Sequence, residues 1–252
     1  MANVMVPFTN GKGGVGKTAL ACSYAAARAH EGADVILADT NEGQQTAMAW
    51  SAVRAHNDIL PKVRVQPANT REALEMVGRC DVLVVDTPGW NDKGTLLLAR
   101  KSTFMVIPTG PSPTFDLAPT VKLLHGLRAE GIETWRMGVV LSRFSNDDKI
   151  RDSEEELART YLREAGQGQG GYTVLEGSVR NAPAYGAGLA EGYGLTEIDR
   201  GRGLADEARG MMNTISKGVS AALQKLMRLE KELGAFRSNP GKGKERDGGR
   251  GR

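Results

Sequence analysis

The sequence predicts a single α/β domain in which a mainly parallel, twisted sheet is flanked by helices on both faces. Three observations predict this fold. Short apolar runs recur along the chain and are typical of buried strands, the first at residues 4–8. A glycine-rich loop follows that run and leads into an Ala-rich, helix-forming stretch at residues 18–30. The chain has 252 residues, of which 40% are hydrophobic and 25% charged, so it can bury one substantial core.

The chain divides into one long domain and a short tail. We expect the domain to cover residues 1–235 and the tail residues 236–252. From Ser238 to Arg252 the tail has no apolar residue to bury, which predicts disorder. Its excess of Lys and Arg would attract phosphate backbones without sequence preference, although a merely solubilising end fits equally well.

The net charge does not identify a partner, whereas the two cysteines indicate a reducing compartment. The net charge of +3 is too small to identify a partner. Cys22 and Cys80 fit buried core thiols in a reducing compartment, rather than a disulfide or a metal pair. No basic and apolar leader precedes the first strand, and no uncharged apolar run approaches about 18 residues. We therefore expect a cytoplasmic protein.

The loop at residues 11–18 reads GKGGVGKT and fits the phosphate-binding pattern G-x-x-x-x-G-K-[ST]. Glycines let successive backbone N–H groups turn toward phosphate oxygens, with no Cβ to block the approach. Lys17 would reach the β and γ phosphates, and the Thr18 hydroxyl would hold Mg²⁺. The loop also ends at a helix N-terminus, where the macrodipole favours an anion. The sequence therefore predicts a nucleoside triphosphate site.

Lys12 makes this loop unusual. The run from Lys12 to Thr18 resembles the deviant Walker A motif of the ParA/MinD superfamily of ATPases, and the chain resembles small ParA proteins such as ParF from residue 2 to about residue 230. In that family the first lysine reaches across a nucleotide-sandwich dimer to the phosphates bound by the other subunit. The resemblance implies a homodimer that forms on ATP binding, with ATP and Mg²⁺ as cofactors. Taken alone, Lys12 would also fit a solvated loop charge.

The second buried run, residues 35–39, ends in Asp39, at the edge where open α/β sheets place their chemistry. The resemblance places Asp39 near Mg²⁺ and its water shell, with Trp50 in the helix that follows. Asn41 stands where the family has the Asp that positions or activates the attacking water, the family's Pro is missing and one residue is inserted. We expect slow turnover, because an amide cannot accept a proton as a carboxylate can, or else replacement of that Asp by Glu42.

The third buried run, residues 80–86, has Walker B form and ends in Asp86. An aspartate at this strand end holds Mg²⁺ through water, and Gly89 supplies a backbone hinge able to sense the γ phosphate. By itself, such an aspartate would also fit a helix cap. Between the second and third runs, we expect an edge strand at residues 63–65. A helix is predicted at 70–78, with Leu74 and Val77 facing inward.

The middle of the chain continues the alternation of strands and helices. We expect a strand at residues 103–108, then a segment at 109–117 that resembles the proline-rich segment of small ParA proteins. A helix follows at 119–127, with Leu117, Val121, Leu124 and Leu127 on one face. The next strand, 135–141, runs into Arg143, which the resemblance places near the adenine. A surface arginine at a strand end fits the sequence equally well.

The later segments carry less chemistry. Acidic residues at 152–156 predict a helix start, and the glycine-rich stretch at 166–171 a mobile loop before a strand at 172–175. Residues 178–183 resemble the family's segment after its last core strand. From Met212 to Leu233, apolar residues recur three and four apart, at a period of 3.5. This seam fits a terminal helix packed on its own sheet, a partner or dimer contact, or a membrane-lying helix.

The function that these residues predict is an ATPase, with slow hydrolysis of ATP to ADP and phosphate. The resemblance implies partition or positioning of DNA, from a plasmid or a chromosome, or of another cargo. It also implies ATP-dependent, non-specific DNA binding and a cargo-bound, ParB-like adaptor that stimulates hydrolysis, with nucleoid association if DNA is the cargo. The alternatives are a MinD-like membrane ATPase, which we do not favour, and a regulatory module that holds ATP with little hydrolysis.

The predicted site residues fall into three groups. The expected nucleotide-binding residues are Gly11, Lys12, Gly13, Gly14, Val15, Gly16, Lys17, Thr18, Ala19 and Arg143. The expected catalytic residues are Lys12, Lys17, Asp39, Asn41 and Asp86. The expected metal-binding residues are Thr18, Asp39 and Asp86.

Overall fold

The computed structural model describes residues 3–89, 92–167, 171–199, 201 and 203–238 of the chain. Within these residues one sheet of seven strands forms, in the order β3-β2-β4-β1-β5-β6-β7, and every neighbouring pair is parallel. The strands are β1 (Val4–Phe8), β2 (Val35–Asp39), β3 (Arg64–Pro67), β4 (Val82–Asp86), β5 (Met105–Thr109), β6 (Met137–Phe144) and β7 (Thr173–Arg180). The predicted parallel α/β fold is confirmed.

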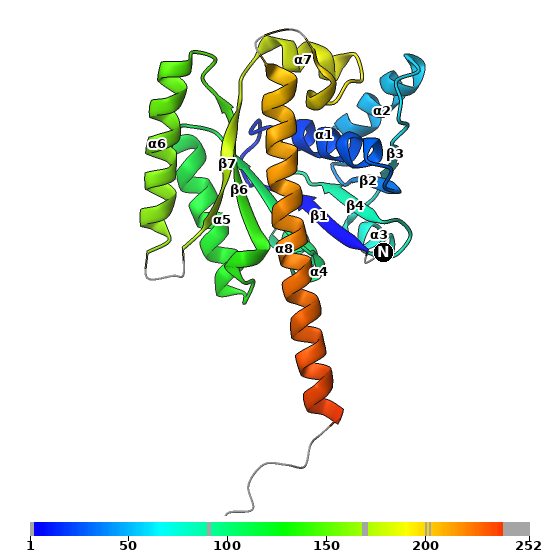
Figure 1. The fold of residues 1–252 in the computed structure, drawn as a ribbon, viewed down its shortest axis with the longest axis vertical. Helices are drawn as coiled ribbons and strands as arrows, with labels where there is room; N and C mark the ends of the chain where they lie inside the picture. Colours follow the sequence, from blue (N-terminus) through cyan, green and yellow to red (C-terminus); the bar gives the residue numbers. More distant parts are fainter. Residues whose placement is uncertain (1–2, 90–91, 168–170, 200, 202, 239–252) are drawn as a thin grey trace, which may run out of the picture.

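Helices connect the strands and cover both faces of the sheet (Figure 1). They are α1 (Lys17–His30), α2 (Thr46–His56), α3 (Thr70–Glu75), α4 (Asp92–Lys101), α5 (Ala118–Ala129), α6 (Asp148–Ala165), α7 (Pro183–Ala190) and α8 (Leu204–Ser238). Three short turns of other helix types occur at Pro113–Leu117, Thr134–Arg136 and Leu195–Glu197. None of the helices described is long and apolar enough to cross a membrane.

The five central strands, β2, β4, β1, β5 and β6, are buried on both faces, and alternate residues along them belong to different cores, whereas the edge strand β3 is mostly exposed. In β1, Val6 and Phe8 face the core formed with α1, α2, α7 and α8, whereas Met5 faces the core formed with α3 and α4. Met105 and Ile107 of β5 pack instead on α5 and α6. This two-sided burial explains why the strands are near-continuous apolar runs rather than alternating patterns.

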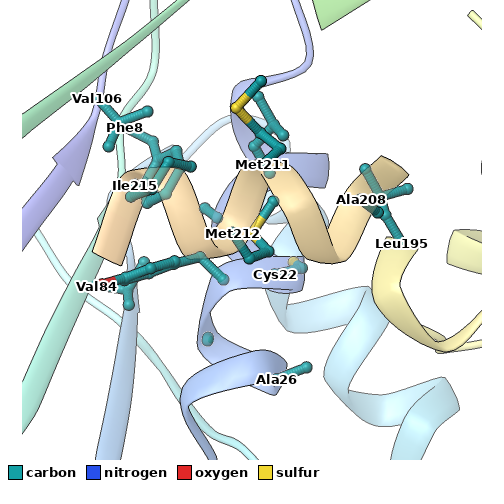
Figure 2. Close-up of a cluster of buried hydrophobic side chains, with 14 of the residues drawn as sticks. Phe8, Cys22, Ala26, Val84, Val106, Leu195, Ala208, Met211, Met212 and Ile215 are labelled. Carbon is teal, nitrogen blue, oxygen red and sulfur yellow. The ribbon is translucent and has the colours of Figure 1, made fainter. Parts of the chain in front are cut away.

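The core under α8 packs this last helix against the first strand and the first helix, β1 and α1. Figure 2 shows side chains of α8, α1 and three central strands in one cluster, among them Phe8, Cys22, Val84, Val106, Met211, Met212 and Ile215. Cys22 and Cys80 are both buried free thiols, which agrees with the interpretation of the cysteines as small core residues. The predicted packing of Met212, Ile215, Val219 and Ala222 on the sheet is confirmed.

Helix α2 is fixed by a buried ion pair and a tryptophan. The guanidinium of Arg54 is buried and donates to both carboxylate oxygens of Glu197 at 2.7 Å, and also to the carbonyls of Pro61 and Gly192. Trp50 Nε1 donates to the Tyr193 carbonyl at 3.1 Å. Segments more than 130 residues apart in sequence are thereby held together.

Three residues predicted to face inward, Leu74, Val77 and Val121, are not fully buried. Val77 is 44% exposed, because α3 ends at Glu75 and the chain turns through Gly78, which has a φ of 88°. The helical period therefore stops before residue 77, and Met76 is buried instead. Val121 of α5 is only partly buried, whereas Leu124 and its neighbours in α5, Leu123 and Leu127, are buried as core residues.

Several predicted boundaries are wrong. The strands predicted at 135–141 and 172–175 continue to Phe144 and Arg180. Helix α6 begins at Asp148 instead of 152, because the Asp147 side chain accepts from the N–H groups of Lys149 and Ile150 and caps the helix there. Residues 178–180 belong to β7 and do not follow the last core strand. Helix α8 begins at Leu204, two turns before the predicted seam. Residues 239–252 and part of the predicted loop at 166–171 lie outside the described residues.

Candidate nucleotide-binding site

The carboxyl ends of the central strands bring the predicted site together. In the sheet register, Asp86 of β4 is aligned with Phe8 of β1 on one side and with Asp39 of β2 on the other. The glycine loop follows β1 directly, so it lies over the same edge. This is the edge at which open parallel sheets bind ligands.

A buried asparagine anchors the start of the glycine loop. Asn10 Nδ2 donates to the Pro108 carbonyl and to Thr120 Oγ1, both at 2.7 Å, and Asn10 Oδ1 accepts from the Lys12 N–H at 3.0 Å. The side chain thus ties the loop to β5 and α5. We did not predict Asn10. The available signal was a polar residue between a buried strand and the glycines.

The glycine loop requires its glycines at two positions. Gly14 and Gly16 have φ values of 80° and 88°, a backbone region that favours glycine. A Cβ on Gly16 would also lie 2.8 Å from Ser142 Oγ. Gly16 is the N-cap of α1 and no side chain caps that helix, so the loop presents uncapped N–H groups at a positive helix end.

A cavity of about 570 Å³ opens over this loop. Its lining contains seven of the ten predicted nucleotide-binding residues and also Asn41. The lining residues are Gly13, Gly14, Gly16, Lys17, Thr18, Ala19, Asn41, Gln44, Thr46, Thr87, Gly89 and Arg143. Gly11, Lys12 and Val15 do not line it, and Val15 is buried. Gln44, Thr46 and Thr87 were not predicted to belong to the site, and Gly89 was predicted only as a hinge that senses the γ phosphate.

The two lysines of the loop lie in different places. Lys17 is in the cavity, and its Nζ donates to the Lys12 carbonyl at 3.0 Å. Burial lowers the pKa of Lys17 below its ordinary value, and the nearby Asp86 carboxylate opposes that shift. Lys12 is partly exposed and contributes only its backbone to these contacts.

Asp86 and Thr18 form the part of the site that fits a divalent cation. Thr18 Oγ1 donates to Asp86 Oδ2 at 2.7 Å. Asp86 Oδ1 is buried and has no hydrogen-bond partner among the described residues. Burial raises the pKa of Asp86 to about 7, and the proximity of Asp39 adds to the rise. An added cation would satisfy this oxygen and offset the cost of burying its charge.

The described residues contain no cluster of three or more His, Cys, Asp or Glu side chains able to hold a metal ion. Mg²⁺ does not need one, since it commonly binds one or two protein oxygens together with phosphate oxygens and water. Thr18 and Asp86 supply that set.

Asp39 has a different environment from Asp86. Its Oδ1 accepts from the Asn41 N–H at 3.1 Å, and its Oδ2 accepts from the N–H groups of Ala47 and Met48 at 3.0 and 3.1 Å. Asp39 therefore closes the loop between β2 and α2 and holds the N-terminus of α2. Its predicted action near the metal remains a prediction.

The loop after Asp39 places two amide side chains, those of Asn41 and Gln44, beside the cavity. Asn41 Nδ2 donates to Gln44 Oε1 at 3.2 Å, and both side chains belong to residues that line the cavity. Glu42 instead lines a second hollow of about 360 Å³, which adjoins the first through Asn41 and Thr87 and is also lined by Asn69 and Thr70. Gln44, and not Glu42, therefore lies beside the glycine loop.

Arg143 lines the cavity beside the glycine loop. Its backbone has a φ of 64°, which is unusual for a residue with a side chain. The guanidinium donates to the Gly14 carbonyl, and its Nε contacts Asn181 Oδ1 at 3.4 Å. The prediction that Arg143 belongs to the site is consistent with this position, and its role at the adenine remains a prediction.

Fold and site together define a P-loop nucleotide-binding protein of the parallel α/β class. The model of the CobQ/CobB/MinD/ParA nucleotide binding domain matches residues 6–186, and the chain belongs to this family. The predicted ParA/MinD resemblance is confirmed. The match includes the glycine loop, Asp86 and Arg143, and ends before α8.

Among curated proteins, the chain is similar to the maintenance of carboxysome distribution protein A of Gloeobacter kilaueensis. The two are 37% identical over 124 residues, which is 48% of this chain and 55% of that protein. The chain thus matches about half the length of this relative.

Solved structures show the same fold at low identity. The cell division ATPase MinD of Pyrococcus furiosus has a TM-score of 0.65 at 17% identity, over 86% of this chain and 99% of that one. A Cyanothece McdA–ATP complex has a TM-score of 0.65 at 15% identity, over 89% and 97%. A putative plasmid partition protein of Borrelia burgdorferi bound to AMPPNP gives 0.63 at 13%, over 86% and 99%.

Proposed function

We propose that this chain is an ATPase that binds ATP with Mg²⁺, dimerises in the ATP-bound state and uses this cycle to position or partition a cargo. The observation that carries the proposal is the separation of the two loop lysines. Lys17 lines the cavity, whereas Lys12 is partly exposed and lies outside it. A lysine placed outside its own cavity is free to meet the phosphates of a second copy, as the family resemblance implies.

The residues of the cavity suit phosphoryl transfer with slow turnover. The loop N–H groups and Lys17 would bind the phosphates, and Thr18 with Asp86 would hold Mg²⁺, which neutralises phosphate charge. Asn41 and Gln44 would orient water by hydrogen bonds. Because neither amide can take a proton, we expect hydrolysis to be slow until a partner protein stimulates it.

The cargo is a plasmid, a chromosome or a large protein body. Two similar proteins support this range, since one is described as maintaining carboxysome distribution and another as a putative plasmid partition protein. We propose that the ATP-bound dimer binds DNA without sequence preference in the cytoplasm, on the nucleoid. A cargo-bound, ParB-like adaptor would then stimulate hydrolysis and release.

A second function is favoured by the amide pair at Asn41 and Gln44. A site that has no carboxylate beside the attacking water would also suit a regulatory module. Such a module would hold ATP and bind different partners in its different nucleotide states. Such a module would form nucleotide-dependent dimers and show no partner-stimulated hydrolysis. Measurement of turnover with and without the adaptor separates the two functions.

The main experiment measures mass by light scattering, and co-sedimentation with DNA and with acidic vesicles, in ADP and in a non-hydrolysable ATP analogue. We expect dimers and DNA retention only with the analogue, and loss of both in Lys12→Ala. Lys149→Ala, which removes an exposed lysine of α6, is the matched control and should behave as the parent. A monomer in the ATP analogue, or an unaffected Lys12→Ala, would contradict the proposal. Retention on vesicles alone would favour a membrane-associated protein.

A further inference from the structure

A hollow separate from the nucleotide cavity lies between α4 and α5. Its volume is about 730 Å³, which exceeds the 570 Å³ of the cavity over the glycine loop. The two hollows share no lining residue. We call the hollow between the two helices the α4–α5 groove.

The two helices run side by side in the same direction and set the length of the groove. Each follows a strand of the parallel sheet, so both begin at the carboxyl edge of the sheet, where Gly11 lines the groove. At the other end, Arg100 and Glu130 form an exposed ion pair at 3.3 Å. The lining residues of α5 extend from Pro119 to Glu130, which is about 17 Å of helix. The groove therefore has room for a helix of about three turns.

The floor of the groove is apolar. It is formed by Leu96, Pro119, Leu123 and Leu127, and the neighbouring Leu97 of α4 is 50% exposed. A concave apolar surface of this kind is typical of a binding site for another molecule. Because the groove lies between two helices, it offers no strand edge to an extended peptide. A third helix is the segment that packs between two others.

Gly126 provides an independent observation. It lies inside α5, where glycine lowers helix stability relative to alanine. Its backbone is not left-handed, and a Cβ at this position would meet no atom within 4 Å. Neither the conformation nor the packing of this chain therefore requires glycine here. Close approach of a partner's backbone would require it, since a side chain on residue 126 would occupy part of the groove.

The charges of the groove indicate the chemistry of its occupant. Lys93 and Lys122 line the groove near the glycine-loop end, are exposed, and form no ion pair within the described part of the chain. Glu130, at the other end, already has Arg100 as its partner. A complementary occupant therefore carries carboxylates near the two lysines. A DNA backbone would match the lysines but leave the apolar floor uncovered.

We propose that the α4–α5 groove binds an amphipathic, acidic helix of a partner protein. Its apolar side chains lie on the floor, its backbone approaches α5 at Gly126, and its carboxylates meet Lys93 and Lys122. A helix of about three turns buries a small area, so the contact is weak and reversible.

The position of the groove connects its occupant to the nucleotide site. Gly11 lines the groove and directly precedes Lys12. Gly89, which lines the nucleotide cavity, lies three residues before the start of α4. An occupant thus lies beside two segments that border the phosphate site. We assign this helix to the adaptor that stimulates hydrolysis, and only that assignment rests on the proposed function.

The first test measures the fluorescence anisotropy of a labelled peptide with the full chain in ADP. The probe is a helix-forming peptide of about 14 residues of Ala, Leu and Glu, with leucines three and four apart and glutamates beside them. A second probe carries lysines in place of the glutamates. We expect the acidic probe to bind with a Kd of about 10–100 µM and the basic probe at least about tenfold more weakly. No binding of the acidic probe, or equal binding of both, would overturn the proposal.

A glycine variant locates the bound probe. We expect Gly126→Leu to weaken binding of the acidic probe at least about fivefold, because the new side chain fills the groove. Gly210→Leu is the matched control, since Gly210 also lies inside a helix and a Cβ there would meet no atom within 4 Å. Equal losses in the two variants would overturn the proposal.

A charge variant tests the complementarity. We expect the double variant Lys93→Glu, Lys122→Glu to weaken the acidic probe at least about fivefold, with a smaller loss at high salt. The control is Lys101→Glu, Lys149→Glu, which makes the same change in net charge at two exposed lysines outside the groove. An effect of the control equal to that of the groove variant would overturn the proposal.

The conservative variant Gly126→Ala separates binding from folding. We expect it to raise the melting temperature of the free chain by about 1–3 °C, because alanine favours the helix, and to weaken the acidic probe about threefold. A lower melting temperature would show that the fold itself requires this glycine, and would overturn the proposal.

The outcome for the groove is independent of the outcome for the ATPase cycle. Groove-dependent binding by a chain that neither dimerises nor hydrolyses ATP would support the groove and contradict the proposed function. ATP-dependent dimers without probe binding would overturn the groove proposal alone. Duplex DNA that depends on Lys93 and Lys122, with no binding of the acidic probe, would also overturn it.

Discussion

The Thr18 hydroxyl donates a 2.7 Å hydrogen bond to Asp86 Oδ2, and so joins the glycine loop to the end of β4. The other oxygen of Asp86 is buried and has no partner among the described residues. The two sequence motifs that predicted the site thus meet at one carboxyl group. The pKa of that carboxyl group is raised, because burial disfavours its charged form more than the neighbouring groups stabilise it.

The first prediction concerns the pH dependence of stability in EDTA without nucleotide. Burial raises the pKa of Asp86 from 3.8 to about 7. The folded state therefore binds this proton more tightly than the unfolded state, and ionisation destabilises the fold as pH rises from about 4 to about 7. We expect Asp86→Asn to raise the free energy of unfolding by about 2–4 kcal/mol at pH 8 and by little at pH 4.

Denaturant unfolding at several pH values measures this difference. Asp58→Asn is the control, because Asp58 is exposed and already has a φ of 51°, which asparagine tolerates. A parallel pH dependence of Asp86→Asn and the parent would contradict the assignment.

The second prediction compares two glycines of the same loop. Gly16→Ala forces an L residue into a φ of 88° and brings its Cβ to 2.8 Å from Ser142 Oγ. We expect a loss of about 2–3 kcal/mol of unfolding free energy, together with loss of nucleotide binding. Gly13→Ala meets no atom within 4 Å and should cost less than about 1 kcal/mol. Chemical unfolding without nucleotide measures both, and equal losses would refute the steric explanation.

The third prediction distinguishes the contributions of Asn41, Glu42 and Gln44 to ATP hydrolysis. Asn41 and Gln44 line the cavity, whereas Glu42 does not. We expect Gln44→Ala to slow ATP hydrolysis about tenfold, and Asn41→Asp to accelerate it by at least that factor by restoring a proton acceptor. Glu42→Gln should change the rate less than about twofold.

Phosphate release at saturating ATP gives these rates, and a fluorescent ATP analogue checks that affinity is retained. If Glu42→Gln abolished hydrolysis while Gln44→Ala and Asn41→Asp had no effect, Glu42 would be the working group after all.

The fourth prediction contrasts a buried with an exposed ion pair. Arg54 is 2% exposed and donates two hydrogen bonds to the mostly buried Glu197 carboxylate, so Arg54→Ala removes the principal partner of that charge and should cost about 3–5 kcal/mol. Arg64 and Asp34 are both more than half exposed, and Arg64→Ala should cost less than about 1 kcal/mol. Thermal or denaturant unfolding at pH 7 compares them, and similar costs would contradict the burial argument.

The same pair has a predictable acid response. Burial tends to raise the pKa of Glu197, but the hydrogen bonds from Arg54 and Gly194 outweigh it and hold the pKa below 4.5. A depressed pKa contributes stability that is present above about 4.5 and is lost as pH falls through the folded value. The difference between parent and Arg54→Ala should therefore shrink below pH 4, and a constant difference would contradict this.

The sequence predicts what depends on local pattern. The glycine loop, the buried strands and Asp86 follow from residue types at fixed spacing, and the structure places them as expected. Other features depend on how distant segments meet. Arg54 and Glu197 are 143 residues apart, and no periodicity connects them.

Loop geometry accounts for the remaining errors. The turn of residues 40–45 decides which side chains enter the cavity, and spacing alone did not distinguish Glu42 from Gln44. Likewise, the Asp147 cap and the left-handed turn at Gly78 move helix ends by several residues. Each depends on a few backbone angles that the periodicity of apolar residues does not encode.

The hydrogen bonds that hold α2 in place restrict which parts of the site can move when a ligand binds. Asp39 accepts hydrogen bonds from N–H groups in the first turn of this helix. Further along the helix, Trp50 and Arg54 donate hydrogen bonds to backbone carbonyls of residues 192 and 193. Only the six residues between β2 and α2 are then left to rearrange when a phosphate arrives or departs. We expect such a rearrangement to be a short local movement of this loop and not a sliding of the helix, so a partner that responds to this movement must contact the loop itself.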